Sequence, residues 1–128
     1  MKGVYVLIIQ LNGDTAVSVG ALGTLAFKKG LYAYVGSSQT NMEQRIRRHL
    51  RREKQFFWHI DYLLNSSAAK IVQVFHKQAD KVEECAIAMA LGERGESIDG
   101  FGCSDCKCRS HLFRIRDCGF LQESMQTY

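Results

Sequence analysis

Arg45 and His49 have the residue types and the spacing of a pair that could act on a charged oxygen group. They are four residues apart, and on a helix two side chains at that spacing lie on the same face. The arginine guanidinium is planar and permanently charged, so it can clamp phosphoryl oxygens with two hydrogen bonds. A histidine beside it can orient another group or carry a proton. The pair therefore predicts a partly buried anion site.

Glu84 is the carboxylate that could complete such a site. It lies in the alanine-rich segment Val82 to Leu91, which favours a helix that is apolar nearly all round. Its carboxylate must reach an edge of that helix, or be buried beside a cation that offsets its desolvation. A single carboxylate suits Mg²⁺, which keeps most of its waters and takes one or two protein ligands. Glu83 points about 100° away and would exchange roles with Glu84 if the helix boundary shifted.

The five cysteines are a second group of candidate ligands. Their number is odd and the first residues show no secretory pattern, so we expect thiols or metal ligands in a cytoplasmic protein. The string Cys103-x-x-Cys106-x-Cys108-x-x-His111 has the ligand types of a structural Zn²⁺ site. Its spacing departs from paired Cys-x-x-Cys knuckles, and reduced, partly buried thiols are the alternative.

Basic charge is concentrated in one part of the chain. Residues 27–59 carry a net charge of +6, whereas the rest of the chain carries −2. Such a surface attracts polyanions, although a solvated helix face that maintains solubility has the same composition. A membrane-surface helix is disfavoured because one face lacks bulky apolar residues. The candidate nucleic-acid contacts are Arg47, Arg48, Arg51, Arg52 and Lys54.

Length and composition bound the fold. The chain has 128 residues, of which 46% are hydrophobic and 23% charged, values that favour one globular domain and exclude disordered or fibrous classes. The longest apolar stretch, Val4 to Ile9, is far shorter than the roughly 20 residues of a membrane span. There is no proline, so turns depend on glycine, asparagine, aspartate and serine.

Apolar periodicity and turn residues predict an α+β fold, a small mixed or antiparallel sheet with helices packed on it. The expected strands are Val4–Leu11, Ala16–Val19, Leu22–Phe27, Gly30–Val35, Lys70–Phe75 and His111–Ile115, the second pairing back on the first as a hairpin. The expected helices run from Thr40 or Asn41 to about Lys54 along the stripe Met42, Ile46 and Leu50, from Phe56 to Leu64, and from Val82 to Leu91. Residues 1–118 should form a single domain and residues 119–128 a frayed tail.

Two tyrosine motifs complete an ordered set of candidate residues. Gly3-Val4-Tyr5 lies on the first expected strand and Tyr34-Val35-Gly36 ends a later one, ahead of Arg45, His49 and Glu84. In order, residue types and most spacings this set resembles the GIY-YIG nuclease superfamily. The strings GLYAYVGSS, RIRRHLRREK, WHIDYLL and GFGCSDCKC resemble its Uri-type, endonuclease-like branch of small archaeal and bacterial proteins. The resemblance covers Lys2 to about Ile115.

The resemblance implies an endonuclease that hydrolyses phosphodiester bonds in DNA with Mg²⁺ or Mn²⁺. Tyr5, Tyr34, Arg45 and His49 would line its site and Glu84 would bind the metal. One tyrosine would take the proton from water, directly or through a relay. Because an unperturbed tyrosine has a pKa of about 10, a neighbouring metal and arginine must favour the phenolate. Taken without the other motifs, two tyrosines on paired strands are also typical of aromatic side chains that line a core.

Two features depart from the family pattern. Residues 6–33 separate the tyrosine motifs, more than the family usually has, which predicts an inserted hairpin at about residues 12–27 that alters substrate access. Ser37 stands where some members carry a lysine, so a cation that would lower a tyrosine pKa is absent there. Lys28 or Lys29 could replace it.

Some roles and functions stay open. On a helix the side chains of His59 and Asp61 would point apart, so a shared metal site is disfavoured. We expect instead that both are buried and hydrogen-bonded and that they fix the helix. Trp58 could stack on a base. The alternative function is a non-catalytic nucleic-acid-binding module on the same scaffold. A zinc-stabilised protein interaction domain is a third. Relatives joined to a base-excision glycosylase domain make DNA repair, with a repair partner protein, an implied process. RNA is a further possible substrate.

Overall fold

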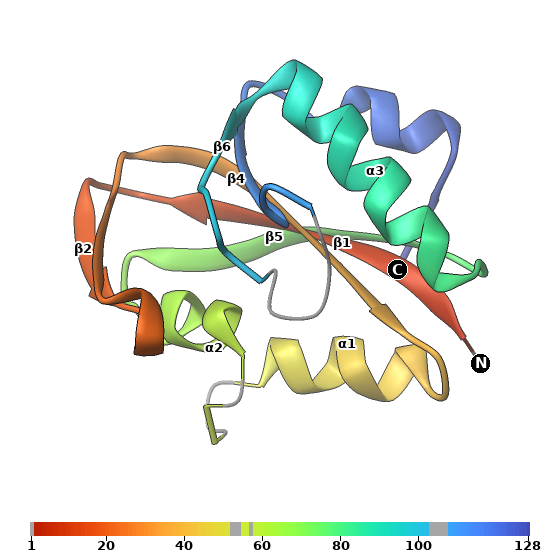
Figure 1. Ribbon diagram of the computed structural model, residues 1–128, viewed down its shortest axis with the longest axis horizontal. Coiled ribbons are helices and arrows are strands. Elements are labelled where there is room, and N and C mark those ends of the chain that lie inside the picture. The colour runs from red at the N-terminus through yellow and green to blue at the C-terminus, as the bar shows by residue number, and fades with distance from the viewer. Residues whose placement is uncertain (1, 52–54, 57, 103–107) are drawn as a thin grey trace.

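A six-stranded antiparallel sheet with helices on both faces forms the centre of the molecule (Figure 1). The computed structural model describes residues 2–51, 55–56, 58–102 and 108–128. Along the sheet the strand order is β6-β7-β4-β1-β5-β8, which confirms the predicted α+β class. The strands are β1 (Gly3–Leu11), β4 (Gly30–Ser38), β5 (Ala69–Lys77), β6 (Glu96–Ser97), β7 (Leu112–Ile115) and β8 (Gln126–Thr127).

The inserted hairpin forms a small sheet of its own at one end of the molecule (Figure 1). It consists of β2 (Thr15–Ser18) and β3 (Thr24–Phe27), joined by the 3-10 turn η1 (Gly20–Leu22). The prediction that the second strand pairs back on the first is wrong, because β2 pairs with β3. Both edges of β1 are occupied, one by β4 and the other by β5.

Helices α1 (Met42–Leu50) and α2 (His59–Leu64) lie on one face of the main sheet, and α3 (Lys81–Arg94) lies on the other (Figure 1). The predicted cap is present, because the Asn41 side chain accepts a hydrogen bond from the Gln44 backbone N–H at 3.1 Å. α1 ends earlier than predicted, since Arg51 is already extended. Leu50 is 46% exposed, so its predicted place in the apolar stripe was wrong. No helix in the described residues is long and apolar enough to cross a membrane.

The sheet separates two hydrophobic cores. Successive side chains of a strand point to opposite faces, and β1 is buried on both because it is a central strand. Tyr5 and Leu7 pack on the side of α1 and α2, whereas Val4 and Val6 pack on the side of α3. The two cores are therefore lined by alternate residues of the same strands.

Residues 119–128 do not fray as the sequence suggested. They form the 3-10 helix η2 (Gly119–Glu123) and β8, which pairs with the outer edge of β5. Leu121 and Met125 are buried in the core on the α3 side. Apolar burial and an otherwise open strand edge thus order the tail.

Candidate active site

A cavity of about 470 Å³ opens where β4 extends beyond the start of β7. The last residue pair between these strands joins Tyr34 to Leu112, and β4 continues to Ser38. This gap in the sheet lets side chains from both faces meet. The cavity is lined by Tyr5, Tyr34, Gly36, Ser37, Ser38, Gln39, Thr40, Arg45, Trp58, His59, Lys81, Glu84, Gly102 and His111.

Glu84 enters this cavity from α3. It is 7% exposed, and its Oε1 accepts a hydrogen bond from the Ser37 hydroxyl at 2.9 Å. Its Oε2 lies 3.2 Å from Nδ1 of His111, a residue that the sequence assigned to zinc. Glu83 instead pairs with Lys77 at 3.1 Å and is not among the residues that line the cavity. The structure therefore places Glu84, and not Glu83, with the other candidates.

Arg45 is held at the opposite side of the same cavity. Its Nη1 donates a hydrogen bond to the Ser37 carbonyl at 3.1 Å, and its guanidinium carbon lies 4.6 Å from the centre of the Trp58 ring. A cation over an indole face is attracted to it. Trp58 therefore positions this arginine, a role that the sequence did not reveal.

Tyr5 and His49 form a buried pair beneath the cavity. The Tyr5 hydroxyl lies 2.7 Å from Nε2 of His49, and both residues are 2% exposed. Burial raises the pKa of Tyr5, although the charge and hydrogen bond of Arg45 oppose the shift. Burial also raises the pKa of Tyr34. Without a metal, both tyrosines are thus neutral phenols near pH 7, because Arg45 alone does not offset their burial.

The glycines of the two tyrosine motifs allow close packing. Gly36 lies opposite Tyr5 in the β1–β4 register, and a Cβ at Gly36 would lie 2.5 Å from the Tyr5 hydroxyl oxygen. A Cβ at Gly3 would lie 2.6 Å from the Met42 sulfur of α1. A larger residue at Gly36 would therefore displace Tyr5 from His49.

Arg48 differs from the other candidate nucleic-acid contacts. Its two terminal nitrogens lie 3.0 Å from the two carboxylate oxygens of Asp61, whose side chain is fully buried. Asp61 also accepts a hydrogen bond from the Trp58 backbone N–H at 3.0 Å, so the interpretation of Asp61 as a buried residue that fixes the helix is confirmed. Arg48 therefore joins α1 to α2 and is not a free surface cation. His59 is only half-buried, and its Nδ1 accepts a hydrogen bond from the Gly102 N–H at 2.9 Å, so the prediction that it is buried together with Asp61 is wrong.

A second hollow of about 700 Å³ runs along α1. It is lined by Arg47 and Arg51, both exposed, and it shares Arg45 with the candidate active site. The hollow along α1 and the cavity that contains Glu84 therefore adjoin at Arg45. Of the other predicted contacts, Arg52 and Lys54 lie outside the described residues.

Comparison with known families matches residues 4–128 to the family described as "Domain of unknown function DUF123". The chain belongs to this family. The matched residues span both the hairpin of β2 and β3 and the C-terminal strand β8. No curated protein and no solved structure gives a significant match.

A cluster of soft ligands adjoins the cavity of this DUF123 domain. Ligand atoms of Cys85, Cys108 and His111 lie within 4.8 Å of one another and could bind a metal ion. The sequence missed Cys85 because it is 23 residues from Cys108 along the chain, and only the fold brings α3 against the segment before β7. Cys103 and Cys106, the other predicted zinc ligands, lie outside the described residues.

Alkaline pH should destabilise the protein through Tyr5 and Tyr34. Tyrosines ionise near pH 10 in the unfolded chain, whereas burial raises both pKa values in the native state. Below pH about 10 both tyrosines contribute fully to the free energy of unfolding. Above that pH the unfolded chain loses protons that the native chain keeps, so the free energy of unfolding falls by about 1.4 kcal/mol per pH unit for each tyrosine. Urea denaturation over a pH series should show this slope flattened in Tyr5→Phe/Tyr34→Phe. Tyr128→Phe, at an exposed position, is the control. If the double variant has the same slope as this control, the prediction is wrong.

Proposed function

We propose that this protein is a divalent-metal-dependent endonuclease of the GIY-YIG type, in its Uri-type branch, that hydrolyses phosphodiester bonds in DNA. One observation carries the proposal: Glu84 from one face of the sheet meets Tyr5 and Arg45 from the other in a single cavity. The cavity brings together Tyr5, Tyr34, Arg45 and Glu84. The family resemblance assigns these four residues to catalysis and metal binding, which supports the proposal.

The cavity suits Mg²⁺ or Mn²⁺ at Glu84. Glu84 is the one carboxylate among the described residues that line it, and Mg²⁺ needs only one or two such ligands. The volume of about 470 Å³ leaves room for a hydrated ion, since each water takes roughly 30 Å³. When bound, the metal would supply positive charge at the phosphate oxygens.

The protein's own residues provide the remaining steps. Arg45, fixed by Ser37 and Trp58, binds a non-bridging phosphate oxygen and stabilises the charge that develops there. Tyr5 begins as a phenol because its pKa is raised. It passes its proton to Nε2 of His49, 2.7 Å away, as its oxygen takes the proton of the attacking water. Tyr34, on the cavity wall, orients that water.

The hollow along α1 carries the DNA backbone into the cavity. Arg47 and Arg51 provide phosphate contacts that are independent of sequence, and Arg45 lies where the hollow and the cavity meet. We further propose that the protein is cytoplasmic, that its thiols are reduced, and that it acts in DNA repair. We also propose a partner protein, because a domain of this size has little surface for substrate selection.

A cleavage assay with a substrate panel tests this function. Supercoiled plasmid and branched, abasic and single-stranded DNA and RNA are incubated with Mg²⁺, Mn²⁺ or EDTA. The wild type should cut a DNA substrate only with metal, and Arg45→Ala should lower the cleavage rate roughly 10² to 10³-fold. Arg47→Ala, on the same helix, is the matched control and should mainly weaken binding. Binding without cutting would favour the non-catalytic module, and full activity in Arg45→Ala would overturn the assigned site.

A further inference from the structure

We propose that Cys85, Cys108 and His111 bind a zinc ion, at a site separate from the one assigned to Mg²⁺. The three residues come from two segments: Cys85 from α3, and Cys108 and His111 from the residues before β7. A shared ion would join these segments at the wall of the cavity, because His111 also contacts Glu84. Its role is to fix α3, and with it Glu84, against the sheet.

The spacing of the ligand atoms fits a tetrahedral ion after a small adjustment. The two Sγ atoms are 2.8 Å apart, and all three ligand atoms lie within 4.8 Å of one another. Zn–S bonds of about 2.3 Å place two sulfur ligands roughly 3.8 Å apart in a tetrahedral site, and a Zn–N bond of about 2.0 Å places the nitrogen roughly 3.5 Å from each sulfur. The sulfurs therefore need to separate by about 1 Å, which side-chain rotation can supply.

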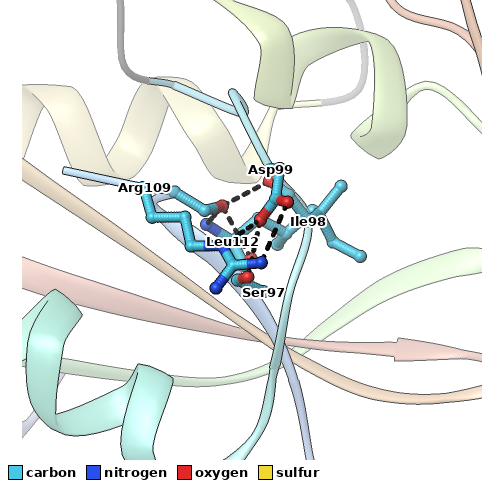
Figure 2. A network of polar contacts seen from close by, with 6 residues as sticks. Ser97, Ile98, Asp99, Arg109 and Leu112 are labelled. Carbon is cyan, nitrogen blue, oxygen red and sulfur yellow. Dashed lines mark hydrogen bonds and ion pairs between the residues drawn. The ribbon is translucent and has the colours of Figure 1, made fainter. Parts of the chain in front are cut away.

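The segment between Cys108 and His111 contacts residues 97–99, and Figure 2 shows the pairing of Arg109 with Asp99. Arg109 donates hydrogen bonds to both carboxylate oxygens of Asp99, at 2.8 and 3.3 Å. The Ser110 hydroxyl lies 2.5 Å from the Ile98 carbonyl, and the His111 N–H bonds to the Phe101 carbonyl at 2.9 Å. The ligands are thus positioned before any metal arrives, which lowers the entropic cost of binding.

The donor set selects zinc over the harder ion assigned to Glu84. Thiolates with an imidazole favour Zn²⁺, whereas Mg²⁺ takes carboxylates and water. A metal-bound histidine generally donates its other ring N–H to a carboxylate, and the contact between His111 Nδ1 and Glu84 Oε2, at 3.2 Å, offers that arrangement. Zn²⁺ binds cysteines as thiolates, so its two positive charges balance the negative charges that the two sulfurs acquire when they lose their protons on binding.

Cobalt provides a direct probe of this site. The full chain, purified with reductant and stripped of metal, is titrated anaerobically with Co²⁺. The wild type should bind about one equivalent and show thiolate-to-cobalt charge-transfer absorption with the intense visible bands of tetrahedral Co²⁺. Zn²⁺ should abolish both. Cys85→Ser and Cys108→Ser should lose the charge-transfer band or most of its intensity, whereas Cys118→Ser should keep it in full.

The titration is read together with zinc content and folding. The native protein, before stripping, should release about one zinc per chain to a chromogenic chelator after its thiols are blocked. Circular dichroism shows whether each variant folds. A wild type without thiolate charge transfer, a Cys85→Ser variant with the wild-type spectrum, or a Cys85–Cys108 disulfide that persists in reductant would overturn the proposal. None of these readouts depends on DNA cleavage, so the result stands apart from the nuclease assay.

Discussion

Glu84→Gln should abolish metal-dependent DNA cleavage while the protein stays folded. The substitution keeps the size of the side chain, and an amide oxygen can still accept the Ser37 hydrogen bond. It removes the negative charge that holds the metal, and no other carboxylate of the described residues lines the cavity to replace it. We expect a loss of about 10³-fold or more in the cleavage rate at saturating DNA.

The adjacent glutamate gives a matched control for this experiment. Glu83→Gln removes the same charge one residue away, where the carboxylate pairs with Lys77 outside the cavity, and should leave cleavage nearly unchanged. Rates are measured over a Mg²⁺ titration, with thermal unfolding to verify the fold. Equal cleavage rates in Glu84→Gln and the wild type would show that Glu84 is not the metal ligand.

Asp61→Asn should be the most destabilising of the single substitutions considered. Asp61 is fully buried and accepts hydrogen bonds from the two terminal nitrogens of Arg48 and from the Trp58 backbone N–H. Removing one member of a buried ion pair leaves the other charge uncompensated, which costs about 3–5 kcal/mol. We expect the urea midpoint to fall accordingly, with the contact between α1 and α2 lost first.

Two further variants separate this effect from a general loss of charge. Asp99→Asn breaks an exposed pair with Arg109 and should lower the free energy of unfolding by only about 0–1 kcal/mol. Arg48→Met combined with Asp61→Leu replaces the ion pair by apolar side chains and should recover most of the stability. If Asp61→Asn unfolds at the same urea concentration as Asp99→Asn, the buried pair does not stabilise the fold as proposed.

Local signals predicted much of the fold. β-branched runs and turn residues located the central strands, and the Asn41 cap located the start of α1, because those features depend on near neighbours. The pairing of β2 and the order of residues 119–128 depend on which strand edges remain open. That information is distributed over the whole chain.

The candidate site shows the same division. The helical spacing of Arg45 and His49 predicted that both face the same side of α1, and the structure places Arg45 in the cavity and His49 against Tyr5. The pairing of Arg48 with Asp61 and the approach of Cys85 to Cys108 join residues that are distant in sequence, and no local pattern marks them. Burial, which raises the pKa of both tyrosines in the absence of a metal, is a property of the assembled cores.

In the proposed nuclease, the gap beside β4 would link activity to cooperative folding. Tyr5 and His49 are positioned by the core under α1, and Glu84 by the core under α3. A chain in which only one core has formed would hold half of the catalytic groups, because they meet only through the gap. A nascent or partly unfolded chain could therefore bind DNA through the arginines of α1, but it could not cut. Under the proposed function, cleavage would begin only when both cores have folded.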